Sequence, residues 1–581
     1  MHSAGGRYII VFNGEVYNFA EMRAELEKFG ERFRGHSDTE VILAAVERWG
    51  LAQALSRFVG MFAIALWDGA EQTLYLARDR MGEKPLYYGW FGGQFIFASE
   101  LKALRAHPAF RGEVDRDSLT LYLRHNYIPA PYSIWKSVSK LTPGSYLAIR
   151  PGATECEVTP FWRIHDVARR GLQQPFAGTP DEAVDELEKC LSRSVGGQMV
   201  ADVPLGAFLS GGIDSSVVVA LMQRHSGRPV KTFSIGFHEQ GYNEAQYASE
   251  VARHLGTDHT ELCVTPGEAM DVIPQLPALY DEPFADSSQI PTYLLARMTR
   301  QHVTVSLSGD GGDELFCGYN RYDWADALWR RLDRFPVSLR TGMARLVTSF
   351  PPRAWDRVFK ALSFLIPEKY RYSSPGDKIH KLAELFSVRT PEEIYQQLVS
   401  HWKEPASMVT GGTEPPTILT DRQQWLESDS FEQRMMYLDQ QSYLPDDILV
   451  KVDRASMGVS LETRIPLLDH RVVGFAWSLP LAYKLRDGQT KWPLRQLLFR
   501  HVPRQLIERP KMGFGVPVGE WLRGPLRDWA EELLAERRLR DEGFFDPAPI
   551  RKKWAEHLAG NRNWAYYIWD ILMFQAWLES Q

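Results

Sequence analysis

A run rich in glycine and serine lies directly between a predicted strand and a predicted helix, and no other feature constrains the fold as much. The run is Ser210-Gly211-Gly212-Ile213-Asp214-Ser215-Ser216. It follows the apolar segment 204–209, and its last two residues begin a helix predicted over Ser215–His225. More apolar segments alternate with helices after it: strands over 230–237, 259–264 and 303–307, and a helix over 243–255. Continuously apolar strands that alternate with helices indicate a parallel sheet covered on both faces.

The residues of this run are those of an anion-binding loop. Ligands of open parallel sheets bind at the carboxyl ends of the strands. Glycines let the backbone approach an anion, and the N–H groups of the turn and of the helix N-terminus point at it. No lysine follows the glycines, which excludes the GxxxxGK[ST] phosphate loop. We expect the loop to hold pyrophosphate as a leaving group, with Asp214 holding a cation; the alternative is a capped strand–helix turn.

A second loop of this kind follows the strand predicted over 303–307. It contains three acidic residues among three glycines: Ser308-Gly309-Asp310-Gly311-Gly312-Asp313-Glu314. Like charges repel, so such a turn gains little stability, but it suits a divalent metal, an adenylate or an amino-acid ammonium group. The alternative is an acidic cluster that complements a helix dipole. Two such loops on one sheet favour the ligand site, because both then face one crevice.

A third loop, at 509–517, brackets Lys511 with two glycines and two prolines. Such a loop could close over a site and bring an ammonium group to a developing phosphate charge. A plain surface lysine is the alternative. The chain from 319 to 581 has a mostly helical pattern rich in Trp, Leu and Arg.

The first part of the chain has the pattern of a layered α+β domain. Asp68-Gly69 and Gly92-Gly93 each separate two β-rich segments and predict hairpins, and helices are predicted over 19–29 and 40–49. Taken alone, Asn13-Gly14 predicts a turn and Ser37-Asp38-Thr39-Glu40 a capping box.

A change of pattern marks the boundary between two predicted domains. Residues 171–178 have the composition of a linker, and Thr179-Pro180-Asp181-Glu182 begins a helix with a capping box. We therefore expect domains over 1–165 and 179–581.

Composition excludes several classes of protein. The 581 residues are 44% apolar and carry a net charge of −6, which supports packed cores and disfavours nucleic-acid binding. The four cysteines, at 156, 190, 263 and 317, have no metal-ligand or disulfide-framework spacing and fit a reducing, cytoplasmic location. No run of 18 apolar residues or signal peptide is present, so neither a membrane span nor secretion is expected.

Taken together, these motifs resemble the glutamine-dependent asparagine synthetase family. The likeness runs from about Tyr8 to the C-terminus and includes FNGEVYN, HSDTE, ARDRMGEKPLYY, FASELKAL, LTPGSY, FLSGGIDSS, LSGDGGDELFCGY, LVKVDRASMGVSLETRIPLLDH and ERPKMGFGVP. It implies an N-terminal-nucleophile (Ntn) hydrolase-type glutaminase domain joined to a PP-loop ATP-pyrophosphatase-type sheet with a helical C-terminal part. It also implies that aspartate reacts with ATP to give β-aspartyl-AMP and pyrophosphate, and that ammonia then displaces AMP.

The resemblance assigns roles to particular residues. Asp310 and Lys511 would be catalytic, and Glu314 would contact aspartate. Asp214 and Asp313 would bind Mg²⁺. The ATP site would be formed by Leu209, Ser210, Gly211, Gly212, Asp214, Ser215, Ile235, Ser308 and Gly309. Glutamine would be held by Asn13, Gly14, Glu15 and Asp38.

The front of the chain departs from the family pattern. The family's glutaminase uses an N-terminal cysteine activated by its own α-amine, whereas this chain begins Met1-His2, and its first cysteine is Cys156. The family's opening strand and helix are also missing, so we expect an incomplete glutaminase domain and ammonia-dependent synthesis.

Several alternatives stay open. A related adenylating ligase could use another acceptor, as a β-lactam-forming synthetase or an amidotransferase of a cell-surface sugar does. The chain could be a catalytically idle partner protein, or a PP-loop enzyme acting on tRNA, which the net charge disfavours. The oligomeric state is also open, with a homodimer as one candidate.

Overall fold

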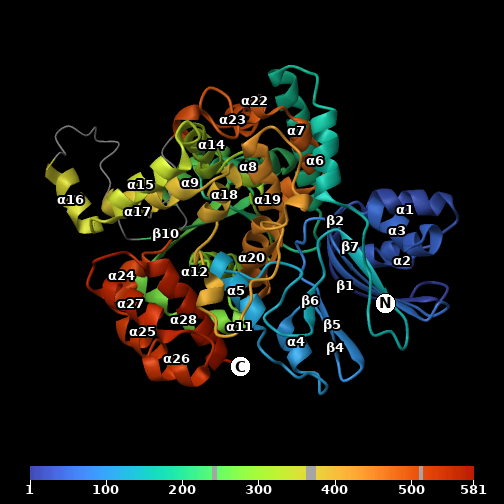
Figure 1. The fold of residues 1–581 in the computed structure, drawn as a ribbon. Coiled ribbons are helices and arrows are strands. Elements are labelled where there is room, and N and C mark those ends of the chain that lie inside the picture. Colours follow the sequence, from blue (N-terminus) through green and yellow to red (C-terminus); the bar gives the residue numbers. More distant parts are fainter. Residues whose placement is uncertain (238–244, 362–374, 509–514) are drawn as a thin grey trace.

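The structure is a computed structural model, and it describes residues 1–237, 245–361, 375–508 and 515–581. A β-rich front part lies beside a larger body of helices that surrounds a parallel sheet (Figure 1). None of the helices in these ranges is long and apolar enough to cross a membrane.

The front part contains two antiparallel sheets. The first has the order β1-β2-β3-β7-β8, with β1 (Tyr8–Val16), β2 (Gly60–Asp68), β3 (Thr73–Arg78), β7 (Ser145–Ile149) and β8 (Val158–Pro160). The second has the order β5-β4-β6, with β4 (Tyr87–Phe91), β5 (Gln94–Ala98) and β6 (Val138–Lys140). Both predicted hairpins, β2–β3 and β4–β5, are confirmed.

Both faces of the first sheet are covered. Three helices share a buried core with one face: α1 (Phe19–Lys28), α2 (Asp38–Trp49) and α3 (Leu51–Arg57). Apolar residues of the second sheet share a core with the other face. The front part is therefore a layered α+β structure, as the sequence predicts.

Two local predictions in the front part are corrected. Asn13 and Gly14 do not form a turn but lie inside β1, where they pair with Ala63 and Phe62 of β2. Pairing with β2 outweighs the local preference of the Asn-Gly sequence for a turn. Ser37 caps α2 by accepting from the Thr39 N–H, but the Glu40 carboxylate accepts from the N–H groups of Arg34 and Gly35, so no reciprocal capping box forms.

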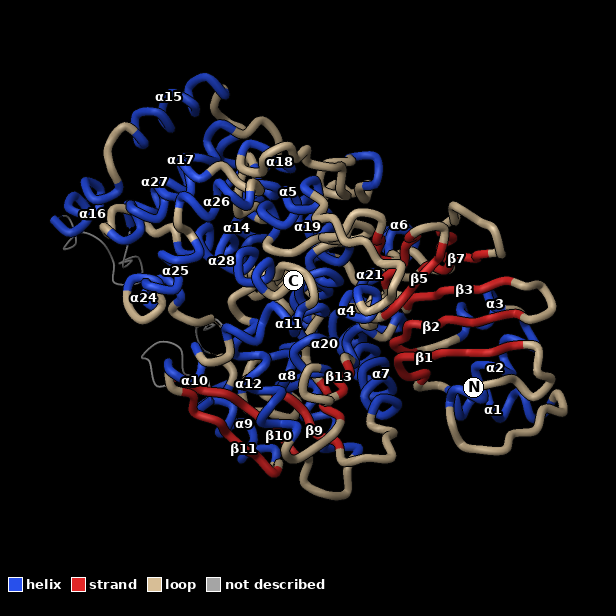
Figure 2. The backbone as a smooth tube through the Cα atoms, turned by 90° about the horizontal axis from the view of Figure 1, so that it is seen from below, coloured by secondary structure: helices blue, strands red, loops and turns tan. Residues whose placement is uncertain are grey.

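The body of the molecule contains a sheet of five parallel strands in the order β11-β10-β9-β12-β13. Its strands are β9 (Leu205–Phe208), β10 (Lys231–Phe237), β11 (Asp258–Val264), β12 (Val305–Leu307) and β13 (Glu462–Arg464). Four were predicted. The fifth, β13, has three residues and lies in a region whose pattern is mostly helical, so the sequence gives no strand signal for it. Figure 2 shows β9, β10, β11 and β13 together at one side of the body.

Helices cover both faces of this sheet. Buried residues of β9 and β12 share a core with α7 (Pro180–Gln198) and α8 (Ile213–His225), whereas Phe233, Ile235 and Phe237 of β10 share another with α12 (Gln289–Arg300). The capping box of Thr179 and Glu182 at the start of α7 is confirmed. The expected linker over 171–178 is shorter, because α6 (Ile164–Gln173) extends into it.

The two parts of the molecule share one core. Trp135 of the front part lies with its ring centroid 5.3 Å from that of Trp577, and the Tyr122 hydroxyl donates to the Asp570 carbonyl at 2.6 Å. Trp577 and Asp570 belong to the last helix of the C-terminal group (Figure 1), which consists of α24 (Val518–Arg523), α25 (Arg527–Leu533), α26 (Glu536–Glu542), α27 (Pro547–Leu558) and α28 (Ala565–Glu579).

Candidate active site

The parallel sheet has a topological switch point between β9 and β12. The chain continues from β9 to β10 and β11 on one side, whereas β12 and β13 lie on the other. Ligands of open α/β sheets bind in the crevice at such a point. The two predicted loops leave the carboxyl ends of these two neighbouring strands.

The two loops touch each other. A methyl group added at Gly309 would lie 2.5 Å from the backbone nitrogen of Ser215, and one added at Gly312 would lie 2.4 Å from Cγ of Asp214. Distances under 3 Å are too short for real Cβ contacts, so glycine is required at Gly309, where the neighbour is backbone.

The first loop is held in shape by its own hydroxyl groups. Gly211 has φ +69°, a conformation suited to glycine. The Ser210 hydroxyl accepts from the Gly212 N–H at 3.2 Å, and the Ser215 hydroxyl accepts from the Ser210 N–H at 3.2 Å. Helix α8 begins at Ile213, two residues earlier than predicted, so Asp214 and Ser215 lie in its first turn, where the helix dipole favours anions.

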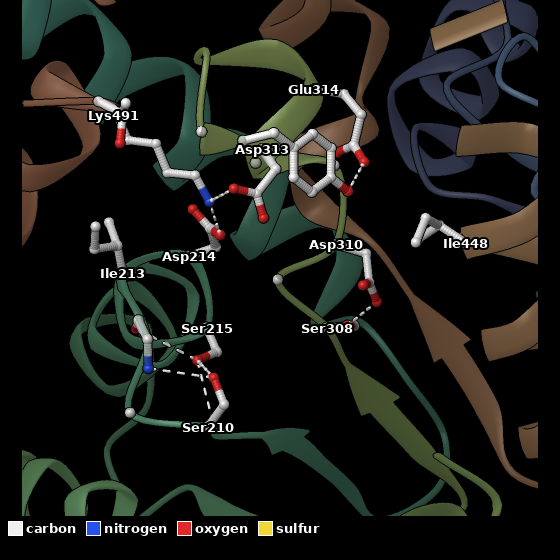
Figure 3. A pocket seen from close by; sticks show the side chains of 18 of the residues that line it. Ser210, Ile213, Asp214, Ser215, Ser308, Asp310, Asp313, Glu314, Ile448 and Lys491 are labelled. Atoms are coloured by element: carbon white, nitrogen blue, oxygen red, sulfur yellow. Dashed lines mark hydrogen bonds and ion pairs between the residues drawn. The ribbon is translucent and has the colours of Figure 1, made fainter. Parts of the chain in front are cut away.

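A lysine that belongs to none of the predicted site motifs connects the two loops. The Lys491 ammonium group lies 2.5 Å from Asp214 and 2.7 Å from Asp313 (Figure 3). Lys491 is buried, has φ +54° and precedes α23 (Trp492–Phe499). Burial lowers the pKa of its ammonium group, but the two carboxylates outweigh this effect and raise it overall. A lone lysine far along the chain carries no motif or periodicity that predicts this position.

The acidic loop keeps two further carboxyl groups inside the site (Figure 3). Asp310 accepts from the Ser308 hydroxyl at 2.5 Å, and burial raises the pKa of Asp310. Glu314 accepts from the Tyr319 hydroxyl at 2.6 Å, and burial, followed by the charge of Asp313, raises the pKa of Glu314 to about 7. Both carboxyls can therefore hold a proton at pH values where exposed ones are ionised.

The loops open into a cavity of about 1400 Å³. Every residue predicted for the nucleotide and acceptor site that the structure describes lines it: Leu209, Ser210, Gly211, Gly212, Asp214, Ser215, Ile235, Ser308, Gly309, Asp310, Asp313 and Glu314. Lys511 lies outside the described residues, although Ile507 and Glu508, just before its loop, line the cavity. Three basic residues for which no sequence motif predicts a role also line the cavity: Lys451, Lys491 and Arg495.

Asp214 and Asp313 suit the metal predicted for them. Their carboxylate oxygens converge on one point, which the Lys491 ammonium occupies. Carboxylate oxygens are the protein ligands that Mg²⁺ prefers, with water and phosphate completing its shell. Among the described residues, no three acidic, histidine or cysteine side chains gather at a possible metal site. Two carboxylates at the edge of a cavity with room for a nucleotide fit a metal bound jointly with that nucleotide.

The residues predicted to hold glutamine lie in the front part, away from this cavity. The Asn13 amide donates to the Ser99 hydroxyl at 3.1 Å, and Asp38 accepts from the Val16 N–H at 3.0 Å. Gly14 pairs inside β1, where a methyl group would lie 2.0 Å from the Met61 carbonyl oxygen. Glu15 lies 3.4 Å from Arg464, and burial raises the pKa of Glu15 to about 7.

Fold and site together define the class of protein. A layered α+β front part precedes a parallel sheet that presents two glycine-rich loops, one of them acidic, to one cavity at a switch point. Two family models match: the glutamine amidotransferase domain over residues 1–162 and asparagine synthase over residues 186–579. The class is thus an amidotransferase domain joined to an ATP-using α/β synthase domain.

The relatives narrow this class to one family. The chain is 33% identical over 573 residues to asparagine synthetase (glutamine-hydrolyzing) 1 of Bacillus subtilis, covering 98% of this chain and 85% of that protein. It is 34% identical over 581 residues to a putative asparagine synthetase of Mycobacterium tuberculosis, covering 99% and 84%. Amidase chyE of Penicillium rubens is 27% identical over 568 residues, covering 92% and 81%. The chain belongs to the glutamine-hydrolysing asparagine synthetase family.

Proposed function

We propose that this protein converts aspartate, ATP and ammonia to asparagine, AMP and pyrophosphate. A side-chain carboxylate oxygen of aspartate attacks the α-phosphorus of ATP, and the bond from that phosphorus to pyrophosphate breaks. The nitrogen of ammonia then attacks the acyl carbon of β-aspartyl-AMP, AMP departs with the electron pair of the C–O bond, and one proton is lost from nitrogen. The observation that carries this proposal is the contact between Gly309 and Ser215, which brings both loops to one cavity.

The first loop would bind the leaving group. Ser210, Gly211, Gly212 and Ser215 offer hydroxyl and N–H groups at the start of α8, where the helix dipole attracts anions. Leu209 and Ile235, with Ser308 and Gly309, would line the nucleoside part of the cavity. With the nucleotide bound in this way, the carboxyl groups of the acidic loop would face the acceptor.

Asp214 and Asp313 would hold Mg²⁺, which when bound neutralises charge on the departing pyrophosphate. Lys491 already brings one positive charge to this point. Asp310 would act in forming the adenylate and Glu314 would contact aspartate. Lys511 would stabilise charge on the phosphorus as the bond to pyrophosphate breaks.

Ammonia is the nitrogen source that we propose for this polypeptide. A nucleophilic thiol needs a lowered pKa, but burial raises the pKa of all four cysteine thiols: Cys156, Cys190, Cys263 and Cys317. In the front part, Asn13, Gly14, Glu15 and Asp38 would bind the α-amino and carboxylate groups of glutamine. A glutamine bound in the front part would therefore have no activated cysteine thiol to attack its side-chain amide.

The test is a product analysis with ATP, Mg²⁺ and aspartate, comparing ammonium with glutamine. We expect AMP and pyrophosphate in equal amounts, asparagine with ammonium, and no glutamate from glutamine. Asp214→Asn should abolish pyrophosphate release. Formation of ADP would refute the proposed bond cleavage. Pyrophosphate release that does not depend on aspartate would point to another acceptor, and release of glutamate would refute the proposed nitrogen source.

A further inference from the structure

A surface at the edge of the molecule combines exposed apolar and basic side chains. It belongs to α15 (Val337–Thr348) and α16 (Pro352–Ala361), which lie at the end of the body farthest from the front part (Figure 1 and Figure 2). Seven of the fifteen large apolar side chains that are exposed among the described residues fall between Trp324 and Val358. Single exposed apolar residues are normal, but a cluster of them indicates an interaction site.

The exposed apolar residues form one stripe along α15. Leu339, Met343 and Leu346 are spaced by four and three residues, so they lie on the same side of the helix. Phe335 precedes the helix and Phe350 follows it, each four residues from the next member of the stripe. All five side chains are 49–66% exposed. The stripe is therefore open to solvent along its whole length.

Another side of α15 attaches the helix to the body. The helix packs against α17 (Pro375–Glu384) and the short 3-10 helix η4 (Leu385–Ser387). Arg340 is buried, and its guanidinium lies 5.9 Å from the centroid of the Trp329 ring. Because these contacts already hold α15 in place, the exposed stripe is not needed to fix the helix to the body.

Basic side chains surround the stripe. Residues 330–360 contain eight basic and two acidic residues, a net charge of +6, whereas the whole chain carries −6. Seven of the eight basic residues are exposed, including Arg334 and Arg345, each of which is next to a member of the stripe in the sequence. One of the seven, Arg330, pairs with Asp326 at 2.7 Å. The surface therefore keeps a strong positive charge on a chain that is acidic as a whole.

We propose that this surface attaches the protein to an anionic lipid surface, with α15 lying along the interface. A helix of this kind buries its apolar side chains at the boundary between head groups and acyl chains, while its basic side chains attract the lipid phosphates. Such attachment needs no spanning helix. It goes beyond the proposed function and does not depend on it.

Two other occupants fit the observations less well. Nucleic acid would use the arginines, because its binding is dominated by phosphate contacts, but it would leave the aliphatic stripe exposed. A second copy of the chain would meet the same patch across a twofold axis, and two patches of positive charge repel each other. An anionic lipid surface uses both the charge and the stripe.

Sedimentation with lipid vesicles tests the proposal. It compares vesicles of phosphatidylcholine alone with vesicles of equal parts phosphatidylcholine and phosphatidylglycerol. We expect the wild-type chain to bind the mixed vesicles about tenfold more tightly or better, because each basic residue near an anionic surface adds to binding. Added salt should weaken this binding by screening. Absence of binding to the mixed vesicles, or equal binding to both kinds, would overturn the proposal.

A first pair of variants tests the apolar stripe. Leu339→Gln combined with Leu346→Gln removes apolar area without changing the charge, and it should weaken binding to the mixed vesicles about tenfold or more. The control combines Phe29→Gln with Val200→Gln, whose side chains are similarly exposed elsewhere, and should bind like the wild type. Normal binding by the stripe variant would mean that charge alone acts, as on any polyanion including nucleic acid, and would overturn the proposal.

A second pair of variants tests the charge. Arg334→Glu combined with Arg345→Glu should weaken binding to the mixed vesicles about tenfold or more. Arg169→Glu combined with Lys189→Glu changes the net charge equally at exposed positions of α6 and α7 and should have little effect. Thermal unfolding shows that each variant folds. Equal losses in the two combinations would overturn the proposal, as would a wild-type dimer that ignores vesicles and dissociates when the stripe is changed.

Discussion

At the scale of single residues, the buried carboxyl of Glu314 makes the stability of the protein depend on pH. Its pKa of about 7 lies above the ordinary value of 4.5, so the folded chain holds this proton more tightly than the unfolded chain. Its contribution to stability is complete below about pH 4.5 and is lost as the pH rises through about 7.

Replacing this carboxyl should therefore stabilise the protein in a pH-dependent way. Glu314→Gln keeps an acceptor for the Tyr319 hydroxyl but carries no charge. At pH 8 we expect the free energy of unfolding to rise by about 3 kcal/mol, and near pH 4.5 to be unchanged. Denaturant unfolding at both pH values measures this, with exposed Glu427→Gln as the control. Equal effects of Glu314→Gln at the two pH values would contradict the assigned pKa.

At the scale of elements, the site depends on two loops that approach each other without side chains. Gly309→Ala would place a methyl group 2.5 Å from the Ser215 backbone nitrogen, so one loop must move. We expect ATP affinity to fall about tenfold or more, while overpacking costs only about 1–3 kcal/mol of stability and the chain still folds. Calorimetry with ATP and Mg²⁺ measures the loss.

Gly197→Ala is the matched control for this change. Gly197 lies near the end of α7, and an added methyl group there would meet nothing within 4 Å. This variant should bind ATP like the wild type and be slightly more stable, because alanine favours the helix. If Gly309→Ala also bound ATP normally, the loops would not form one site.

The two loops could be predicted from the sequence, whereas other parts of the same site could not. Glycine strings after apolar strands predicted the position of the loops, because the signal and the structure are both local. Lys491 and β13 reach the same region only through tertiary packing, and neither three strand residues nor one lysine carries a pattern. Asn13-Gly14 was predicted wrongly for the related reason that pairing with β2 overrides a local turn preference.

At the scale of the whole molecule, a buried ion pair links the front part to the body. The Lys84 ammonium lies 2.8 Å from Asp453 of α20 (Leu449–Met457), and the two side chains are 3% and 10% exposed. Removing one partner of a buried pair leaves a charge without compensation, which costs about 3–5 kcal/mol, whereas apolar residues can replace both at little cost. The pair should therefore contribute more to the specific packing of the front part against the body than to the net free energy of unfolding.

A double-mutant cycle tests this link between the parts. Lys84→Met should lower the free energy of unfolding by about 3–5 kcal/mol, and adding Asp453→Leu should restore most of it. Because Trp135 and Trp577 join the two parts in one core, tryptophan fluorescence and far-UV circular dichroism should report a single shared transition in denaturant. Additive effects of the two substitutions, or separate transitions of the two parts, would show that the pair does not couple them.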